Sequence, residues 1–421
     1  MEQHAKVESE LFPATKRAGE AKPTTLAFGS MLRLGNVPKS SALPSADLPQ
    51  SATALPVRRR LSRRALADSF FRIEARQIQV LAVVALASLA SGCTELRYLT
   101  QASAGQADLM DRQVEIDRIV KEGHFSRRTR GLLAEVAPIK AFGERHGLRA
   151  TASYRTFVNL ERRAVVWVVS ACDPLSFRSK TWSFPVTGSI TYLGWFHHDD
   201  ARAFGDDLRR HGWDVDVRPS SAYSTLGFFD DPVLSTMFVE GEGALGELAD
   251  TILHESLHAT YFVPGQSTLN ESVASFVGGK LAVTYLDETR GKASKAKAAY
   301  VDIEDWMEAR GARMKTAYAA LAALYAKDLP PAEKKSQKTR ILEDLRAATH
   351  AKGDLNNATL VQYKTYGSGQ EELLRLYASC GESWPRFLRT LEGWRPLFSK
   401  ATPHEDPAKL LQPLLARGCA Q

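Results

Sequence analysis

Residues 246–272 read GELADTILHESLHATYFVPGQSTLNES, and this stretch predicts two consecutive helices. Apolar residues recur at helical spacing from Gly246 to Tyr261, and Pro264-Gly265 then ends the first helix. A second helical pattern runs from Leu269 to Leu286. Because the loop between them is short, we expect the two helices to pack side by side in opposite directions.

The first of these helices carries the pattern His-Glu-x-x-His in His254-Glu255-Ser256-Leu257-His258. Residues four apart lie on the same face of a helix, so both imidazoles can reach one cation. Glu255 then lies close enough to act on a water molecule beside that cation. The alternative is a surface helix that carries two histidines by chance. We predict that His254 and His258 bind zinc and that Glu255 is the catalytic base.

A catalytic zinc ion needs a third protein ligand and an open position for water. Glu271 begins the second helix, within Thr268-Leu269-Asn270-Glu271-Ser272, and an antiparallel pair would bring it back over His258. The alternative is an acidic residue that stabilises the N-terminus of its own helix through the macrodipole. We predict that Glu271 is the third ligand of a single zinc ion.

The rest of the body predicts a mixed fold with more helix than strand. Apolar and alternating runs predict strands, whereas longer periodic runs predict helices. Leu329-Pro330-Pro331 interrupts one helical run and predicts a hairpin inserted at about residues 288–345. We expect an α+β fold in one domain, residues 93–421, with a small sheet packed on the His-Glu-x-x-His helix. The predicted strands are Arg163–Ala171, Ser189–Phe196 and Trp213–Val217, and the further helices lie in Ile116–His146, Asp200–His211, Lys292–Leu345 and Asn356–Leu397.

The positive charge of the chain is concentrated at its front. The formal net charge is +7, but residues 1–92 hold 13 Lys and Arg against 7 Asp and Glu, which leaves 42 basic and 41 acidic residues in the remainder. A nucleic-acid-binding protein needs a concentrated basic face. The sequence also has no RNA-binding signature and no Cys/His finger spacing. We therefore exclude nucleic acid as a partner.

The first 92 residues read as two segments. Residues 1–57 are rich in Ser, Ala and Pro, and they predict a disordered extension or a stretch upstream of the true translation start. Residues 58–92 begin with an arginine-rich segment, which is followed by an uncharged run. This run is shorter than the roughly 20 residues that span a bilayer. The segment therefore has the layout of a secretory signal. The alternative is an apolar first helix that stays in the protein.

The sequence Leu89-Ala90-Ser91-Gly92-Cys93 ends this signal-type segment and resembles the lipobox of bacterial lipoproteins. The resemblance implies a lipid on Cys93. Since Thr94 and not Asp follows the cysteine, it also implies anchoring to the outer membrane of the cell envelope, facing the periplasm. Of the remaining cysteines, Cys172, Cys380 and Cys419, two can form a disulfide in an oxidising compartment.

Several segments together resemble the bacterial family named Putative aminopeptidase, a group of zincin-type, gluzincin-like lipoprotein metallopeptidases. The resemblance covers nearly all of the chain from Cys93 onward, and it implies zinc bound by two histidines and a glutamate. Ser256 stands where the family usually has a small aliphatic residue. The segments that carry the resemblance are Ser153–Thr156, Val165–Trp167, Trp182–Gly188, Tyr223–Phe228, His254–His258, Asn270–Ser272, Asn356–Ala358 and Thr365–Tyr366.

Three further groups of residues are candidates for the site. Zincins place an edge strand that binds the substrate backbone before the metal helix, so Tyr223, Ser224, Thr225, Leu226 and Gly227 are predicted to bind substrate. An ordinary core strand is the alternative.

The other two groups supply hydrogen-bond donors or further ligands. Tyr366, or else Tyr363, is predicted to donate a hydrogen bond to the oxyanion, although most tyrosines serve packing. His197-His198-Asp199-Asp200 contains ligand-type residues, but we interpret it as a strand end whose Asp199 or Asp200 caps the next helix.

These features predict a zinc-dependent aminopeptidase that acts on peptides or proteins at the cell envelope, anchored to the membrane by its lipid. In this hypothesis Glu255 takes a proton from water and returns it to the leaving amine. The alternative is a lipid-anchored envelope protein that binds peptides and keeps its zinc for structure or without turnover. The intact Glu255 favours the enzyme, because a structural site needs no general base.

Overall fold

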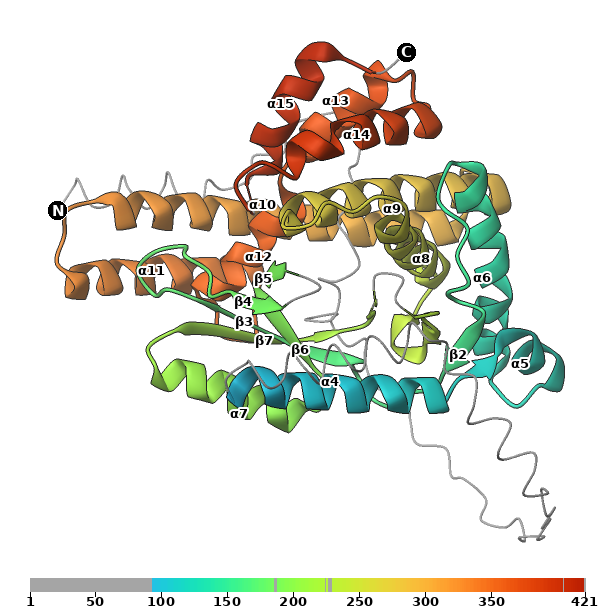
Figure 1. Ribbon diagram of the computed structural model, residues 1–421, viewed down its shortest axis with the longest axis horizontal. Helices are drawn as coiled ribbons and strands as arrows, with labels where there is room; N and C mark the ends of the chain where they lie inside the picture. The colour runs from blue at the N-terminus through green and yellow to red at the C-terminus, as the bar shows by residue number, and fades with distance from the viewer. Residues whose placement is uncertain (1–92, 185–187, 224, 226–228, 404, 420–421) are drawn as a thin grey trace, which may run out of the picture. The chain divides into compact units, whose positions relative to one another are not determined.

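A computed structural model describes residues 93–419, except 185–187, 224, 226–228 and 404 (Figure 1). The side chains of residues 93–96, 188 and 364–367 also lie outside the description. The predicted extension, residues 1–57, and the signal-type segment, residues 58–92, are outside the described residues. The described part falls into two units, residues 93–104 and residues 105–419. The site discussed below lies wholly in the second unit.

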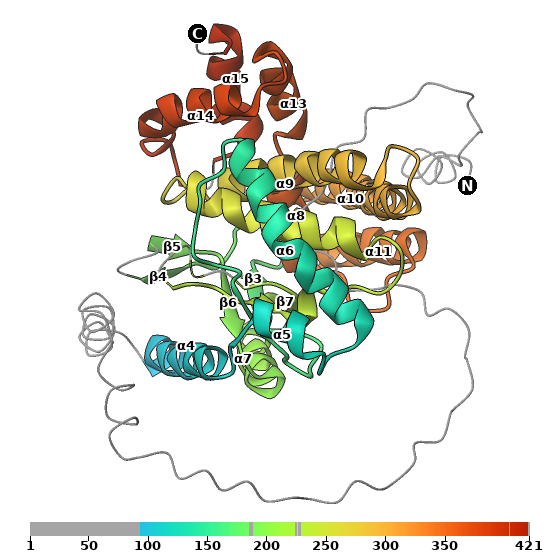
Figure 2. The ribbon, with the colours of Figure 1, turned by 90° about the vertical axis from the view of Figure 1, so that its right-hand side faces the viewer.

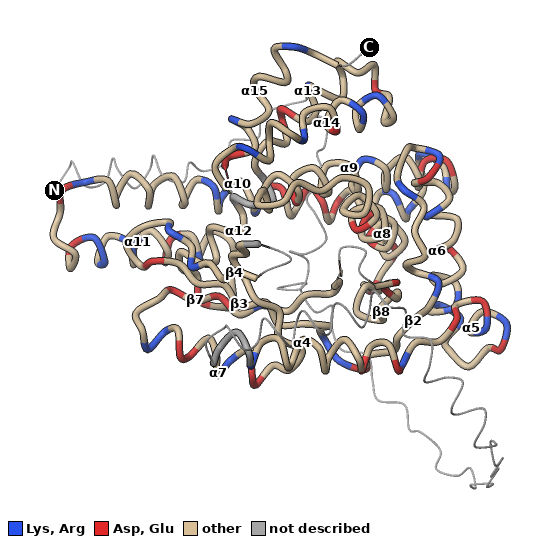
Figure 3. The backbone as a smooth tube through the Cα atoms, in the orientation of Figure 1, with Lys and Arg blue, Asp and Glu red and all other residues tan. Residues whose placement is uncertain are grey.

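Helices make up most of the described chain, so the α+β, mostly helical prediction is confirmed. They are α4 (Cys93–Asp111), α5 (Ile116–Glu122), α6 (Arg127–Arg145), α7 (His198–Arg210), α8 (Ala244–Thr260), α9 (Ser267–Arg290), α10 (Lys295–Ala326), α11 (Pro331–Thr349), α12 (Asn357–Gly367), α13 (Gln370–Ser379), α14 (Trp384–Phe398) and α15 (Pro407–Arg417). Within these residues no helix is both long enough and apolar enough to cross a membrane. Acidic and basic residues are interspersed along most of the helices (Figure 3).

Three small sheets accompany the helices. The antiparallel sheet β6-β3-β7 consists of β6 (Tyr192–Trp195), β3 (Val166–Cys172) and β7 (Asp214–Ser220), with Val169 opposite Leu193 and Val217. Both α7 and α12 pack against it. A mixed sheet joins β1 (Val114–Glu115), β2 (Thr156–Val158) and β8 (Val233–Leu234), and β4 (Trp182–Phe184) pairs with β5 (Gly188–Ile190).

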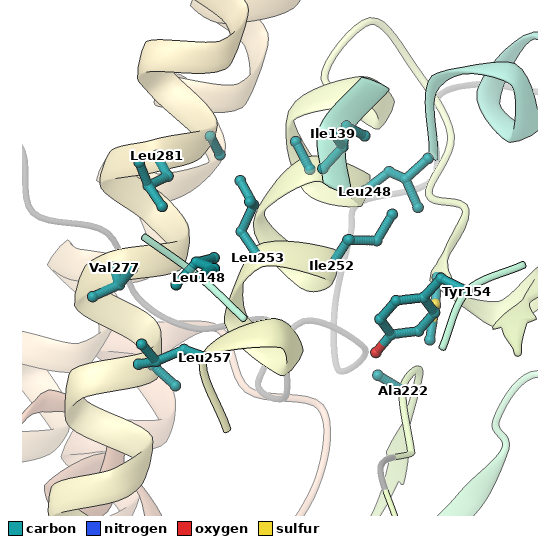
Figure 4. Packing of buried hydrophobic residues seen from close by; sticks show 14 of the residues in the cluster. Ile139, Leu148, Tyr154, Ala222, Leu248, Ile252, Leu253, Leu257, Val277 and Leu281 are labelled. Atoms are coloured by element: carbon teal, nitrogen blue, oxygen red, sulfur yellow. The ribbon is translucent and has the colours of Figure 1, made fainter. Parts of the chain in front are cut away.

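Helix α8 lies at the centre of the main hydrophobic core, where α9, α6 and α10 are its principal neighbours. Nearly every residue of α8 is buried, which suits a helix covered on all sides. Its Leu253 and Leu257 lie toward Val277 and Leu281 of α9 (Figure 4). The views in Figures 1 and 2 show α6 lying across α8.

Three glycines allow neighbouring helices to approach α8 closely. A Cβ added at Gly278 of α9 would lie 2.5 Å from Asp250 Oδ1 and 3.1 Å from His254 Cβ. At Gly246 of α8 an added Cβ would overlap the ring of Tyr300 from α10, and at Gly143 of α6 it would lie 2.8 Å from Leu253. These contacts are shorter than van der Waals distance, so a larger residue would push the helices apart.

The range that predicted a helical hairpin contains α10 and α11, which pack against each other. Pro331 begins α11, a position where the missing N–H of proline costs nothing. That this pair is an insertion in the domain stays a prediction.

The C-terminal helices α13, α14 and α15 follow as a separate group of elements (Figure 1). A disulfide joins Cys380 and Cys419 across this group. Cys172 is a buried free thiol, and burial, followed by the charges of Asp214 and Asp173, raises its pKa to about 12.

Two sequence predictions about α7 and the strands before it were wrong. Helix α7 begins at His198, with His197 in the capping position and no side-chain capping bond, so Asp199 and Asp200 lie in its first turn and neither caps it. Carboxylates in the first turn of a helix also interact favourably with the helix dipole. The sequence pattern therefore does not distinguish an acidic residue in the first turn from one in the capping position. The strand predicted over Ser189–Phe196 is divided at Thr191 into β5 and β6, which belong to different sheets.

Candidate metal centre

Helix α8 presents both predicted histidine ligands to the same place. His254 and His258 are four residues apart on one face of the helix, with ring centroids 5.0 Å apart and ring planes at 81°. The two side chains and Glu255 are buried, with at most 7% of each residue exposed. Buried imidazoles of this kind are costly unless they bond to something.

The turn between α8 and α9 is held by the side-chain amide of Asn270. Its Oδ1 accepts a hydrogen bond from the backbone N–H of Val263 at 2.9 Å, and its Nδ2 donates to the carbonyl of the same residue at 2.9 Å. Gly265 supplies the left-handed conformation, φ 78°, that the turn requires. Together these contacts bring the start of α9 back beside the end of α8 and place Glu271 next to the histidines.

The three predicted ligands meet in a compact buried group. His254 Nε2 lies 3.4 Å from Glu271 Oε2, and His258 Nε2 lies 3.7 Å from Glu271 Oε1. Each of the three residues offers one ligand atom that lies within 4.8 Å of the ligand atoms of the other two. Bonds of 2.0–2.1 Å to a tetrahedral zinc ion would put ligand atoms about 3.3 Å apart. The separations therefore suit three ligands of one small cation.

Charge interactions within this group favour ligand binding by neutral imidazole and ionised carboxylate. Burial, together with the nearby charge of His254, lowers the pKa of His258 to about 4, although the charge of Glu271 opposes the shift. For Glu271, burial raises the pKa, but its interactions with His258 and His254 and the charge of Arg218 outweigh burial and lower it. His258 is therefore neutral and Glu271 ionised near pH 7, the forms in which both bind metals.

His254 shows the opposite shift. Burial lowers its pKa, but the carboxylates of Glu271, Glu255 and Asp250 outweigh burial and raise it. Neither ring nitrogen of His254 makes a hydrogen bond within the part of the chain that the structure describes. A buried imidazole that faces carboxylates without a hydrogen bond is suited to receive a cation. The donor set thus fits a metal ion.

Tyr154 lies beside the predicted base and was not assigned a role from the sequence. It is buried with a left-handed backbone, φ 66°, which is unusual for a bulky residue. Burial, and then the charges of Glu255 and Asp231, raise its pKa well above the ordinary value. Its side chain lies near Ile252 and Ala222 in Figure 4. No sequence signal distinguishes this tyrosine from one that serves only packing.

The loop that carries Tyr154 is fixed by hydrogen bonds. The backbone N–H of Tyr154 donates to the carbonyl of Asp231 at 2.6 Å, and the N–H of Asp231 donates to Ser153 Oγ at 3.1 Å. The Lys140 ammonium group donates to the carbonyls of Thr151, at 3.0 Å, and Ser153. These bonds hold the left-handed backbone in place beside α8.

A cavity of about 270 Å³ reaches Glu271 from the side of the sheet. Its walls come from β3, β7, α9 and α12, and Arg218 of β7 is one of the lining residues. Arg218 was not predicted from the sequence, because a single arginine in a strand has no distinctive pattern.

The predicted substrate-binding segment is only partly described. Tyr223 and Thr225 lie outside any strand, which differs from the strand that the sequence predicted there. Thr225 Oγ1 donates to Asp231 Oδ1 at 2.9 Å, and the ring of Tyr223 contacts Phe196 edge to face. Ser224, Leu226 and Gly227 are outside the described residues, so their predicted role stays a prediction.

The other candidates are placed as follows. Tyr366 lies in α12 and Cys93 lies in α4. The structure does not describe the side chain of either residue. Tyr363 packs in a second hydrophobic cluster with α10 and α11, where its oxygen accepts a hydrogen bond from Arg310 Nε at 3.0 Å. His198 packs its ring on Trp167, at 4.2 Å between ring centroids.

These observations define a mostly helical α+β protein in which two central helices hold a buried group that could bind a metal ion. A protein-family model described as "Putative aminopeptidase" matches residues 97–402, and the chain belongs to this family. No curated protein matches the chain, and no solved structure matches it.

Proposed function

We propose that this chain is a zinc-dependent peptidase of the zincin type with a gluzincin-like site, and that it acts as an aminopeptidase. The observation that carries the proposal is the buried group of His254, His258 and Glu271, with Glu255 adjacent to the first ligand on α8. Membership in the family supports peptide-bond hydrolysis as the reaction.

Zinc fits this donor set better than the harder divalent cations. Two imidazole nitrogens and one carboxylate match the ligands of catalytic zinc, whereas magnesium and calcium favour oxygen ligands. When bound, zinc supplies a Lewis acid for the scissile carbonyl and a water of lowered pKa. In the described part of the chain, three ligand-type side chains gather here, which leaves the fourth position of a tetrahedral ion open.

The side chains around this position divide the remaining work. The Glu255 carboxylate accepts a proton from the attacking water and then donates it to the nitrogen of the leaving amine. Burial of Glu255 keeps bulk water away from that proton. Tyr366 is retained as a proposed donor to the oxyanion, and residues 223–227 as proposed contacts for the substrate backbone.

The alternative function is a peptide-binding protein that keeps zinc for structure. Structural zinc sites are usually closed by four protein ligands and need no general base. The three-residue group and the buried Glu255 therefore favour the enzyme.

We further propose that the protein is exported and anchored at the outer membrane, facing the periplasm, by a lipid on Cys93. The signal-type sequence before Cys93 supports this location. So does the disulfide between Cys380 and Cys419, because such bonds persist in oxidising compartments and are rare in the cytosol. Peptides or proteins of the envelope are then the proposed substrates, with no role for nucleic acid.

The test of the enzymatic proposal is the substitution Glu255→Gln. Because Glu255 acts on water and does not bind the metal, the variant should keep about one zinc per chain while hydrolysis falls by a factor of at least about 100. Elemental analysis and a peptide-library assay, each with and without chelator, measure the two effects. Loss of zinc in the variant, or hydrolysis that survives chelation, would contradict the assigned roles.

A further inference from the structure

The cavity beside Glu271 has a wall rich in hydrogen-bonding groups. Hydroxyl groups from both the sheet side and the start of α9 line it, together with a few apolar residues. Its volume of about 270 Å³ is just below that of typical sites for small molecules, which are about 300–1,000 Å³. It therefore suits the end of a short peptide. The serine and threonine hydroxyl groups on its wall are those of Ser170, Ser179, Thr181, Thr191, Ser267 and Thr268, and Tyr192 and Tyr318 also line the cavity.

Arg218 is the one basic residue among the described residues that line this cavity. Its side chain is 17% exposed, and within the described chain its guanidinium group makes one hydrogen bond, from Nη1 to Asp216 Oδ2 at 3.4 Å. A guanidinium group has five N–H donors in a planar fork. Most of these donors therefore have no acceptor among the described residues and are available on the cavity wall.

Asp216 is held by other contacts besides Arg218. Its carboxylate accepts a hydrogen bond from Gln362 Nε2 at 3.0 Å and one from Thr359 Oγ1 at 3.4 Å. Gln362 also donates to Ser170 Oγ at 2.7 Å, so the network continues without the arginine. Arg218 can therefore share its charge with a second carboxylate.

The acidic groups on the cavity wall are already engaged. Glu271 faces the two histidines. Asp406 caps α15, where its Oδ1 accepts hydrogen bonds from the N–H of Ala408 at 3.1 Å and from Ser368 Oγ at 2.5 Å.

We propose that Arg218 binds a carboxylate group of the substrate, so that peptides held beside Glu271 carry a free carboxylate at or near one end. This assignment rests on the proposed peptidase function and names its substrate class. The planar fork matches a carboxylate in a two-bond geometry that a lysine ammonium group cannot reproduce. The carboxylate comes either from an acidic N-terminal side chain or from the C-terminus of a short peptide.

Binding to the Glu255→Gln protein tests the proposal without turnover. Two matched pairs of peptides are titrated by calorimetry. Glu-Ala-Ala-amide against Gln-Ala-Ala-amide tests the side chain, and Ala-Ala-Ala against Ala-Ala-Ala-amide tests the C-terminus. We expect the acidic member of at least one pair to bind at least about 10-fold more tightly, because a charged hydrogen-bonded pair is formed. Equal affinities within both pairs would overturn the proposal.

Variants in the same Glu255→Gln background separate recognition from structure. Arg218→Ala should remove the preference, Arg218→Lys should retain only part of it, and Asp216→Asn should keep it or strengthen it. The matched control is Arg290→Gln, which breaks an ion pair with Glu135 at the far end of α9, about 28 Å from Glu271 along the helix. A preference that persists in a folded Arg218→Ala protein would contradict the assignment.

The two proposals fail in different ways. A carboxylate preference in a chain that hydrolyses no peptide contradicts the peptidase proposal alone. Hydrolysis by the unsubstituted chain with no difference between acid and amide peptides contradicts the Arg218 proposal alone.

Discussion

Glu271 is the fifth residue of α9, and this position decides between its two possible roles. Helix-dipole effects are confined to the first turn, and α9 has no acidic residue there. Glu271 is instead buried and faces His254 and His258 at 3.4 and 3.7 Å. Ionising a carboxylate in that position is costly without a cation nearby. The geometry thus favours a ligand over a helix-stabilising acid.

Substitutions of Glu271 test this role at the residue scale. Glu271→Ala should lower zinc affinity by more than the roughly 100-fold that changes around a metal site can cause. Glu271→Asp keeps the charge but shortens the reach by one methylene group, so it should also weaken zinc binding. Competition titration with a chromogenic chelator measures both affinities.

The control is Glu288→Ala, which changes an exposed acid on the same helix and should leave zinc affinity unchanged. Normal zinc affinity in Glu271→Ala, with the helix intact by circular dichroism, would refute the ligand assignment. The His197 to Asp200 cluster would then be the next candidate for the missing ligand.

At the scale of elements, the close packing of α8 and α9 sets the distance between the proposed ligands. Gly278 lies where the two helices meet and has no room for a Cβ beside Asp250 and His254. Tyr300 of α10 donates a hydrogen bond to Asp250 Oδ2 at 3.0 Å, so Asp250 is fixed from the other side. The ligand positions on the two helices are therefore coupled to this contact.

The substitution Gly278→Ala should disturb both stability and the site. We expect a loss of about 1–3 kcal/mol in the free energy of unfolding, because the added methyl group overlaps Asp250. Zinc affinity should fall as well, since α9 moves away from α8. Gly131→Ala on α6 has nothing within 4 Å of its added Cβ and should be neutral or stabilising. Equal unfolding energies for the two variants would contradict the packing argument.

Sequence patterns predicted the elements that carry the ligands better than the surroundings of the site. The helices around His254 and Glu271 were predicted because periodicity, the turn at Pro264-Gly265 and the ligand spacing are all local signals. Tyr154 and Arg218 come from loops and strands far away in the chain, and only tertiary packing brings them near α8 and α9.

The C-terminal helix α15 was not predicted from the sequence, for a related reason. The predicted helices stopped at Leu397, whereas α15 (Pro407–Arg417) follows beyond it and is joined to α13 by the Cys380–Cys419 disulfide region. Its short pattern contains Pro413, which argues against a helix when the sequence is considered alone, whereas Pro407 occupies the first helical position, where proline is compatible with a helix. Packing against α13 and α9 stabilises it in the fold.

At the scale of the whole molecule, the proposal to test is the lipid anchor at Cys93. Cys93→Ser should leave the precursor uncleaved by the lipoprotein signal peptidase and unlabelled by radioactive fatty acid, because the thiol that receives the lipid is gone. Cys172→Ser, which removes a buried thiol, should be labelled as in the unsubstituted chain. Unchanged labelling of Cys93→Ser would contradict the lipid anchor.

The central claim is that His254, His258 and Glu271 together hold a zinc ion, and anomalous diffraction tests it most directly. Crystals of the chain grown with zinc are measured on both sides of the zinc absorption edge. We predict one strong anomalous peak about 2.0–2.2 Å from a nitrogen of each histidine and from a Glu271 oxygen, with no fourth protein ligand. A peak elsewhere on the chain, or none at this group, would contradict the account.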